Sequence, residues 1–192
     1  PDEPVKVIGT CDSEKHGTKV TFHPDPEIFE ETVYDYDTLK QRLRETAFLT
    51  KGLRIVLTDT REESHHCHEF HYAGGIKEFV TYLNRSKEAL YPDVIYCEGT
   101  RDGVYVEVAM QHNDSYNDAT YSFVNNIITP EGGTHLAGFR NALTKTFNTY
   151  ARANKILKDS EPALTGDDIR EGLTAIISIK IEEPQFEGQT KQ

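Results

Sequence analysis

The longest periodic pattern of apolar residues lies between Thr129 and Ala151. Apolar side chains recur there at three- and four-residue steps, which places them on one face of an α-helix. They are Leu136, Phe139, Leu143, Phe147 and Tyr150. A Pro-Glu-Gly-Gly turn precedes Thr134, whose hydroxyl is suited to capping a first turn. We therefore predict that the longest helix of the chain begins at Thr134.

A different face of this helix is polar. Asn141, Lys145, Asn148 and Arg152 fall on it and carry two positive charges. Spacing alone favours a solvated helix surface, because charged stripes on helices usually face water.

Shorter patterns ahead of this helix predict strands and two further helices. Alternating or β-rich runs predict strands at 5–9, 19–23, 53–58, 66–72, 93–98, 104–111 and 120–124. Helical spacing predicts a helix at 37–48, capped by Asp37, and another at 76–83. The Arg-Asp-Gly turn at 101–103 is typical of a β-hairpin.

The last part of the chain predicts a short helix, a buried strand and a tail. Thr165-Gly-Asp-Asp168 resembles a capping box, with Asp where Glu or Gln is usual. The run 174–181 is apolar nearly throughout, which predicts a central strand buried on both faces. Residues 182–192 hold too few apolar side chains to pack and predict a mobile tail. Together the elements predict an α+β fold with a mixed, mainly antiparallel sheet covered by helices.

Length and charge narrow the class of protein. The 192 residues suit one domain, or one domain with an appendage. A formal net charge of −11 argues against a grip on nucleic acid by the chain as a whole, so any DNA contact needs a local basic patch. No apolar run is long enough to cross a bilayer, and no charged-then-apolar leader begins the chain, so we expect a soluble, cytoplasmic protein. A first residue of Pro1 suggests a fragment of something larger.

Cysteines and acidic residues offer little chemistry. Cys11, Cys67 and Cys97 lie far apart and form no CxxC motif, which is typical of reduced cysteines. The acidic group Asp167, Asp168 and Glu171 is explained by the free N–H groups of a helix start. The chain holds no Walker A loop and no GxGxxG motif, so we expect no complete nucleotide site.

The run HHCHEFH at 65–71 is the strongest candidate for a metal site. Zinc accepts both imidazole and thiolate ligands. On a strand, however, His66 and His68 face one side, whereas His65, Cys67 and His71 face the other. We therefore assign no metal to this run.

A family resemblance rests on several sequence blocks in order. They are GGTHLAGFRNALT at 132–144, GTKVTFHPD at 17–25, FHYAGGIKEFVTYLN at 70–84, QHNDSYND at 111–118, TGDDIREGLTAIISIKI at 165–181 and EGQTK at 187–191. This set resembles the transducer domain, the second domain in the B subunit of bacterial DNA gyrase, a type IIA topoisomerase. The B subunit of topoisomerase IV shares most of the blocks and is the close alternative.

The resemblance implies a division of the chain. Residues 1–25 would be terminal strands of a preceding ATPase domain, 26–182 the transducer domain, and 183–192 a tail with a Gln-Thr-Lys loop. It also implies a left-handed βαβ crossover, against the usual right-handed rule.

The resemblance further implies roles for single residues. Gln189 and Lys191 would contact the γ-phosphate of ATP, bound with Mg²⁺ mainly outside this chain, and Lys191 would assist hydrolysis. Arg140 would contact the phosphates of a transported DNA duplex. Lys145 and Arg152 are added as DNA contacts from the helix pattern alone. Residue chemistry without the resemblance makes 189–191 only a polar tail.

The same family suggests a mechanical relay. The chain would pass the state of ATP to the DNA gate of a heterotetramer with the gyrase A subunit and a second B subunit. By itself it would neither hydrolyse ATP nor cut DNA. Two interpretations from other classes stay open, a free-standing interaction module and a zinc-binding module.

Overall fold

The computed structural model describes residues 4, 6–14, 18, 20–61, 65–186 and 188. The chain divides into two compact units, Pro1–Asp35 and Tyr36–Gln192. The described residues of the first unit form no helix or strand, so the strands predicted at 5–9 and 19–23 are wrong wherever these ranges are described. Val7, Ile8, Val20 and Phe22 are all exposed. A strand needs a paired neighbour to be stable, and the described residues of this unit provide none.

The second unit is built on a five-stranded sheet in the order β3-β4-β7-β5-β6. Its strands are β3 (Ile95–Arg101), β4 (Val104–His112), β5 (Ala119–Val124), β6 (Ile127–Ile128) and β7 (Leu173–Lys180). Neighbours pair antiparallel except β5 and β7, which are parallel. The predicted mixed, mainly antiparallel sheet is confirmed. Strands β1 (Arg54–Thr58) and β2 (Cys67–His71) form a separate antiparallel pair, as the pattern predicts.

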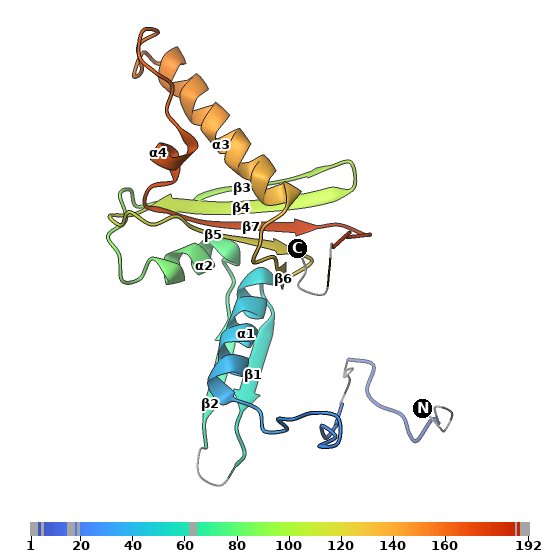
Figure 1. Cartoon of the computed structure of the whole chain (residues 1–192). Coiled ribbons are helices and arrows are strands. Elements are labelled where there is room, and N and C mark those ends of the chain that lie inside the picture. The colour runs from blue at the N-terminus through green and yellow to red at the C-terminus, as the bar shows by residue number, and fades with distance from the viewer. Residues whose placement is uncertain are drawn as a thin grey trace. The chain divides into compact units, whose positions relative to one another are not determined.

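Helices cover both faces of the five-stranded sheet (Figure 1). Helices α1 (Tyr36–Leu49) and α2 (Ile76–Leu83) pack on one face, and α3 (Thr134–Ala153) and α4 (Gly166–Arg170) on the other. Side chains of β7 alternate between the two cores: Ile176 lies in the core under α1 and α2, and Ile177 in the core under α3. The prediction of a central strand buried on both faces is confirmed.

The longest helix begins at Thr134 as predicted, but two predicted helix caps are wrong. Thr134 is the first helical residue of α3, the N-cap is Gly133, and no side chain caps that end. Asp37 lies inside the first turn of α1, which begins at Tyr36. The apolar face of α3 is confirmed for Leu136, Phe139, Leu143 and Phe147, which pack in one core, but Tyr150 is 63% exposed. The C-terminal part of α3 extends beyond the sheet (Figure 1).

Positive backbone φ angles mark two tight hairpin turns. Asp102 and Gly103, between β3 and β4, have φ of 51° and 78°. Asn125 and Asn126, between β5 and β6, have φ of 49° and 66°. Both pairs match the turn that two-residue hairpins favour. The first hairpin was predicted, whereas β6 was not.

The predicted capping box at α4 is confirmed. Thr165 Oγ1 accepts from the backbone N–H of Asp168 at 3.2 Å, and Asp168 Oδ2 accepts from the backbone N–H of Thr165 at 2.7 Å. The pKa of Asp168 lies below its ordinary value, mainly because the side chain of Thr165 donates a hydrogen bond to it and also because the backbone N–H of Thr165 does so. The charged form of Asp168 is therefore the one that supports the helix start.

This cap predicts a pH-dependent effect of Asp168→Asn. A folded pKa below the unfolded one means that the stabilisation is present above the unfolded pKa and is lost as pH falls through the folded pKa. We expect the variant to melt below the wild type at pH 7, and the gap to narrow as pH falls below about 4. Thermal melting followed by circular dichroism over this range tests it. A gap independent of pH would mean that the charge of Asp168 does not support α4.

None of the helices in the described ranges is long and apolar enough to cross a membrane.

Candidate functional site

Helix α3 carries the three basic residues proposed for DNA contact. Over its 20 residues, Lys145 is exposed, while Arg140 and Arg152 are partly buried. The structure does not bring them to one place, because each has different neighbours.

Arg152 holds the chain that follows α3. Its guanidinium donates to the backbone carbonyls of Lys158, at 2.9 Å, and Glu161, at 3.0 Å. Asn148 forms a two-way pair with the backbone of Leu164, at 2.8 and 2.9 Å. The interpretation of this stripe as purely solvated is therefore wrong for Asn148 and Arg152, because the return segment needs partners for its backbone polar groups. Asn141 and Lys145 are exposed as predicted.

Arg140 belongs to a network of ion pairs. Asp118 Oδ2 lies 3.2 Å from Arg140 Nη2 and 3.1 Å from Arg170 Nε. Arg170 Nη2 also lies 2.6 Å from Asp167 Oδ1. The second oxygen of Asp118 accepts from the hydroxyl of Thr120. The network therefore joins α3, α4 and the loop before β5.

Sequence reasoning missed Asp118 and Arg170. Both lie in blocks that carry the family resemblance, QHNDSYND and TGDDIREGL, but no local pattern pairs them. Their contact joins residues 52 positions apart. Guanidinium groups bind phosphate oxygens in a planar, two-pronged geometry, so the pair Arg140 and Arg170 is chemically suited to an anion.

Partly buried polar contacts fix α4 beside this network. His112 Nδ1 lies 2.9 Å from the hydroxyl of Tyr91, which also accepts the backbone N–H of His112. His112 Nε2 lies 2.8 Å from the carbonyl oxygen of Ile169, which can only accept, so this nitrogen carries the proton. The imidazole therefore ties β4 to α4.

A second buried group ties α2 to the sheet. The side chain of Asn84, just after α2, is hydrogen-bonded to Gln111, Asn113 and Thr174 at 2.7–3.2 Å. All four residues are buried. A satisfied buried network of this kind favours one arrangement of its elements.

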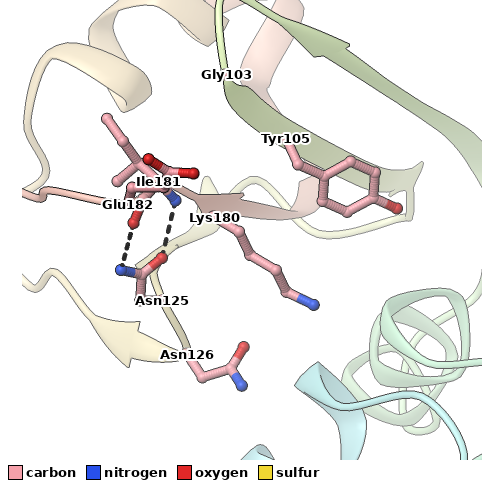
Figure 2. A pocket seen from close by; sticks show the side chains of 7 residues that line it. All are labelled: Gly103, Tyr105, Asn125, Asn126, Lys180, Ile181 and Glu182. Atoms are coloured by element: carbon pink, nitrogen blue, oxygen red, sulfur yellow. Dashed lines mark hydrogen bonds between the residues drawn. The ribbon is translucent and has the colours of Figure 1, made fainter.

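The C-terminal end of β7 is fixed by Asn125 (Figure 2). Asn125 Nδ2 donates to the carbonyl of Ile181 at 2.8 Å, and its Oδ1 accepts from the backbone N–H of Ile181 at 2.9 Å. An open hollow of about 490 Å³ lies here, and the side chain of Lys180 extends into it, 5.8 Å from the ring centre of Tyr105. The backbone is thus held up to Ile181.

Glu98 sits on the same face of the sheet as Tyr105. It accepts hydrogen bonds from the hydroxyls of Tyr96 and Tyr105, both at 2.7 Å. These bonds lower the pKa of Glu98, and the bond to Glu98 is the main reason that the pKa of Tyr105 rises to about 12. Both tyrosines are neutral at pH 7.

The segment after Ile181 passes the start of α3. Gln185 and Phe186 line a hollow of about 390 Å³ together with Gly133, Thr134 and His135. Burial lowers the pKa of His135, so its neutral form prevails at pH 7. Gln189 and Lys191 lie outside the described residues.

The histidine-rich strand behaves as its alternation predicts. The ring of Tyr36 contacts the rings of both His66 and His68, with centroids 5.4 and 6.1 Å apart, and its hydroxyl lies 3.0 Å from His68 Nδ1. Cys67 Sγ lies 3.6 Å from the hydroxyl of Thr58. Within the described ranges, no three side chains of His, Cys, Asp or Glu converge on a point where they could hold a metal.

Two solved structures define the class of fold. The 43K ATPase domain of Thermus thermophilus gyrase B, solved with an aminocoumarin, is 38% identical with a TM-score of 0.75 over 86% of this chain and 44% of that one. The topoisomerase IV ATP-binding domain of Francisella tularensis, solved with an inhibitor, is 25% identical with a TM-score of 0.69 over 88% of this chain and 44% of that one. The fold is thus shared with ATP-binding fragments of bacterial topoisomerases.

Sequence comparison identifies the family. The DNA gyrase B protein of Clostridium acetobutylicum is 59% identical over 98% of this chain, and that of Halalkalibacterium halodurans 57% over 100%. The family model described as DNA gyrase B matches residues 75–192. The chain belongs to the DNA gyrase B family. It spans 29% and 30% of the length of these two relatives.

Proposed function

We propose that this chain is part of the B subunit of a bacterial DNA gyrase, an ATP-dependent type II topoisomerase, and that it relays the state of ATP to the DNA gate. Residues 26–182 form the transducer domain, 183–192 its tail, and 1–25 the end of a preceding ATPase domain. One observation carries the relay: β7 is buried on both faces at the centre of the sheet and leads directly to the segment with Gln189 and Lys191. A displacement of that segment acts on both cores through one strand.

In this proposal Gln189 and Lys191 bind the γ-phosphate of ATP. Lysine offers a compact positive charge and glutamine a neutral N–H donor, which suits a terminal phosphate. ATP and ADP differ in that phosphate, so the tail binds the two states with different affinity. Only such a difference shifts a conformational equilibrium. Binding of ATP then favours one position of the transducer, and loss of the γ-phosphate releases it.

In this proposal the chain also has DNA, protein and metal partners. Arg140, Lys145 and Arg152 contact phosphates of the transported duplex without reading sequence. The gyrase A subunit and a second B subunit complete the complex in the cytoplasm. Mg²⁺ binds together with the nucleotide, mainly outside this chain. Gyrase is favoured over topoisomerase IV because the relatives that are 57–59% identical are gyrase B proteins.

Gln189→Ala in the full-length subunit tests the relay. We expect a non-hydrolysable ATP analogue to bind about 10-fold more weakly, because one hydrogen bond to a charged group is lost. ADP should bind as it does to the wild type, since it has no γ-phosphate. Isothermal titration with both nucleotides makes the comparison. An equal loss for both would place Gln189 away from the γ-phosphate and contradict the relay.

A further inference from the structure

The carboxylate of Asp118, which contacts both Arg140 and Arg170, could neutralise the charge with which Arg140 would bind DNA. If Asp118 paired with Arg140 alone, the guanidinium that we assign to DNA would already be neutralised. A neutralised guanidinium releases no counterion when it meets a phosphate and gains little affinity. A third group must offset Asp118 if Arg140 is to bind DNA.

We propose that Arg170 is this group: it takes up the charge of Asp118 and thereby leaves Arg140 available for a DNA phosphate. The inference rests on the proposed DNA contact of Arg140. It adds Arg170 and Asp118 to the DNA-binding site as positioning residues.

Burial makes Arg170 the stronger partner of Asp118. The side chain of Arg170 is 17% exposed, whereas that of Arg140 is 41% exposed. Opposite charges attract more strongly where less water surrounds them. Arg170 is also fixed by α4, whose Ile169 is buried and bonded to His112. The Asp118–Arg170 pair is therefore the fixed part of the network.

The remaining charge lies on Arg140. Asp118 contacts both guanidinium groups, whereas the second carboxylate, Asp167, pairs among the described residues with Arg170 alone, at 2.6 Å, and is 96% exposed, so that water screens its charge at Arg140. Within the described ranges, Asp118 is the single hydrogen-bonding partner of the Arg140 side chain, through Nη2. This contact orients the guanidinium and leaves its Nη1 donors for a ligand. A phosphate that reaches the exposed part of this side chain would meet a guanidinium whose orientation Asp118 already fixes.

The inference predicts a loss and its rescue. Arg170→Met keeps an apolar stem but lets Asp118 neutralise Arg140. Affinity for duplex DNA should fall about 8-fold at 0.1 M salt, and the salt slope by about 0.9, as for one lost phosphate contact. Arg140→Met should give the same loss. Adding Asp118→Asn to Arg170→Met should restore both quantities, because asparagine keeps an oxygen for Arg140 and removes the charge.

The experiment uses the full-length subunit and a labelled DNA duplex, with binding followed by fluorescence anisotropy over a series of salt concentrations. Arg54→Met is the matched control. It removes one positive charge from the exposed pair with Glu69, at 2.9 Å on β1 and β2, and should bind DNA as the wild type does. If Arg170→Met does not fold, Asp118→Asn alone decides. It should bind at least as tightly as the wild type, and a loss like that of Arg140→Met would overturn the inference.

The outcomes separate this inference from the proposed function. Loss with Arg170→Met and rescue by Asp118→Asn support it, since a merely structural role of Arg170 would not be rescued by removal of an acid. Loss with Arg140→Met but not with Arg170→Met, or loss without rescue, overturns the inference and leaves the DNA contact standing. Normal binding by Arg140→Met overturns the DNA contact and the inference with it.

Discussion

Lys191→Ala is expected to lower ATP hydrolysis by the full-length subunit about 100-fold or more, because one electrostatic contact to developing charge is commonly worth about 10² to 10³ in rate. Nucleotide should still bind, since the proposed function places most of its contacts outside this chain. The melting temperature should stay nearly unchanged, because the segment 182–192 has few apolar residues to pack. Steady-state turnover, nucleotide affinity and thermal melting on the same preparation separate these effects.

Lys77→Ala provides the control for charge. Lys77 is exposed on α2, so its loss removes one positive charge far from the tail in sequence. Its turnover should match the wild type. If Lys191→Ala also hydrolysed ATP at the normal rate, Lys191 would not belong to the ATP site, and the relay would have to act through α3 instead.

Gly172→Ala should be the most destabilising single substitution that we propose. Gly172 has a φ of +71°, and an added Cβ would lie 2.4 Å from the carbonyl oxygen of Asn113 and 2.6 Å from that of Ser115. These backbone atoms cannot move away without breaking the bond from Asn113 N–H to the Gly172 carbonyl, at 2.9 Å. We expect a loss of about 3 kcal/mol or more in the free energy of unfolding. The melting temperature should fall by about 6–12 °C in a chain of this size.

Gly138→Ala is the matched control, because a Cβ at Gly138 would meet no atom within 4 Å. It lies inside α3, where alanine favours the helix by up to about 1 kcal/mol, so this variant should melt at or slightly above the wild type. Thermal and urea unfolding of both variants make the comparison. Equal melting temperatures for the two variants would mean that the loop at 113–115 moves easily to make room for the added Cβ at position 172.

The sequence was informative where local chemistry decides the structure. The apolar run of β7 predicted burial on both faces, and Asp102-Gly103 predicted a hairpin whose φ angles require such residues. The sequence was uninformative where the structure depends on a pairing partner from another part of the chain. The apolar residues near Val7 and Val20 read as strands but have no paired strand among the described residues. The two-residue strand β6 is too short to show a pattern.

The same contrast between local sequence and distant neighbours applies to the candidate site. Arg140 was proposed as a DNA contact because a sequence block resembles a known family. Its network was not found, because Asp118 and Arg170 meet only once the chain has folded. Arg152 read as a surface charge from its spacing, yet it holds two backbone carbonyls of the return segment. Periodicity reports which face a residue lies on, but it does not report what the rest of the chain brings to that face.

The position of β7 in the sheet also determines when this unit can form. Among the described residues it is the last strand along the chain, yet it lies between β4 and β5, which do not pair with each other. Until residues 173–180 leave the ribosome, the hairpin β3–β4 and the hairpin β5–β6 have no strand between them to pair with. The sheet is then incomplete, and the apolar side chains of α2 and α3 that pack on it remain exposed to water. Long-range pairing of this kind slows folding and exposes apolar surface to aggregation. Synthesis of β7 should therefore convert two separate hairpins into one sheet in a single late step.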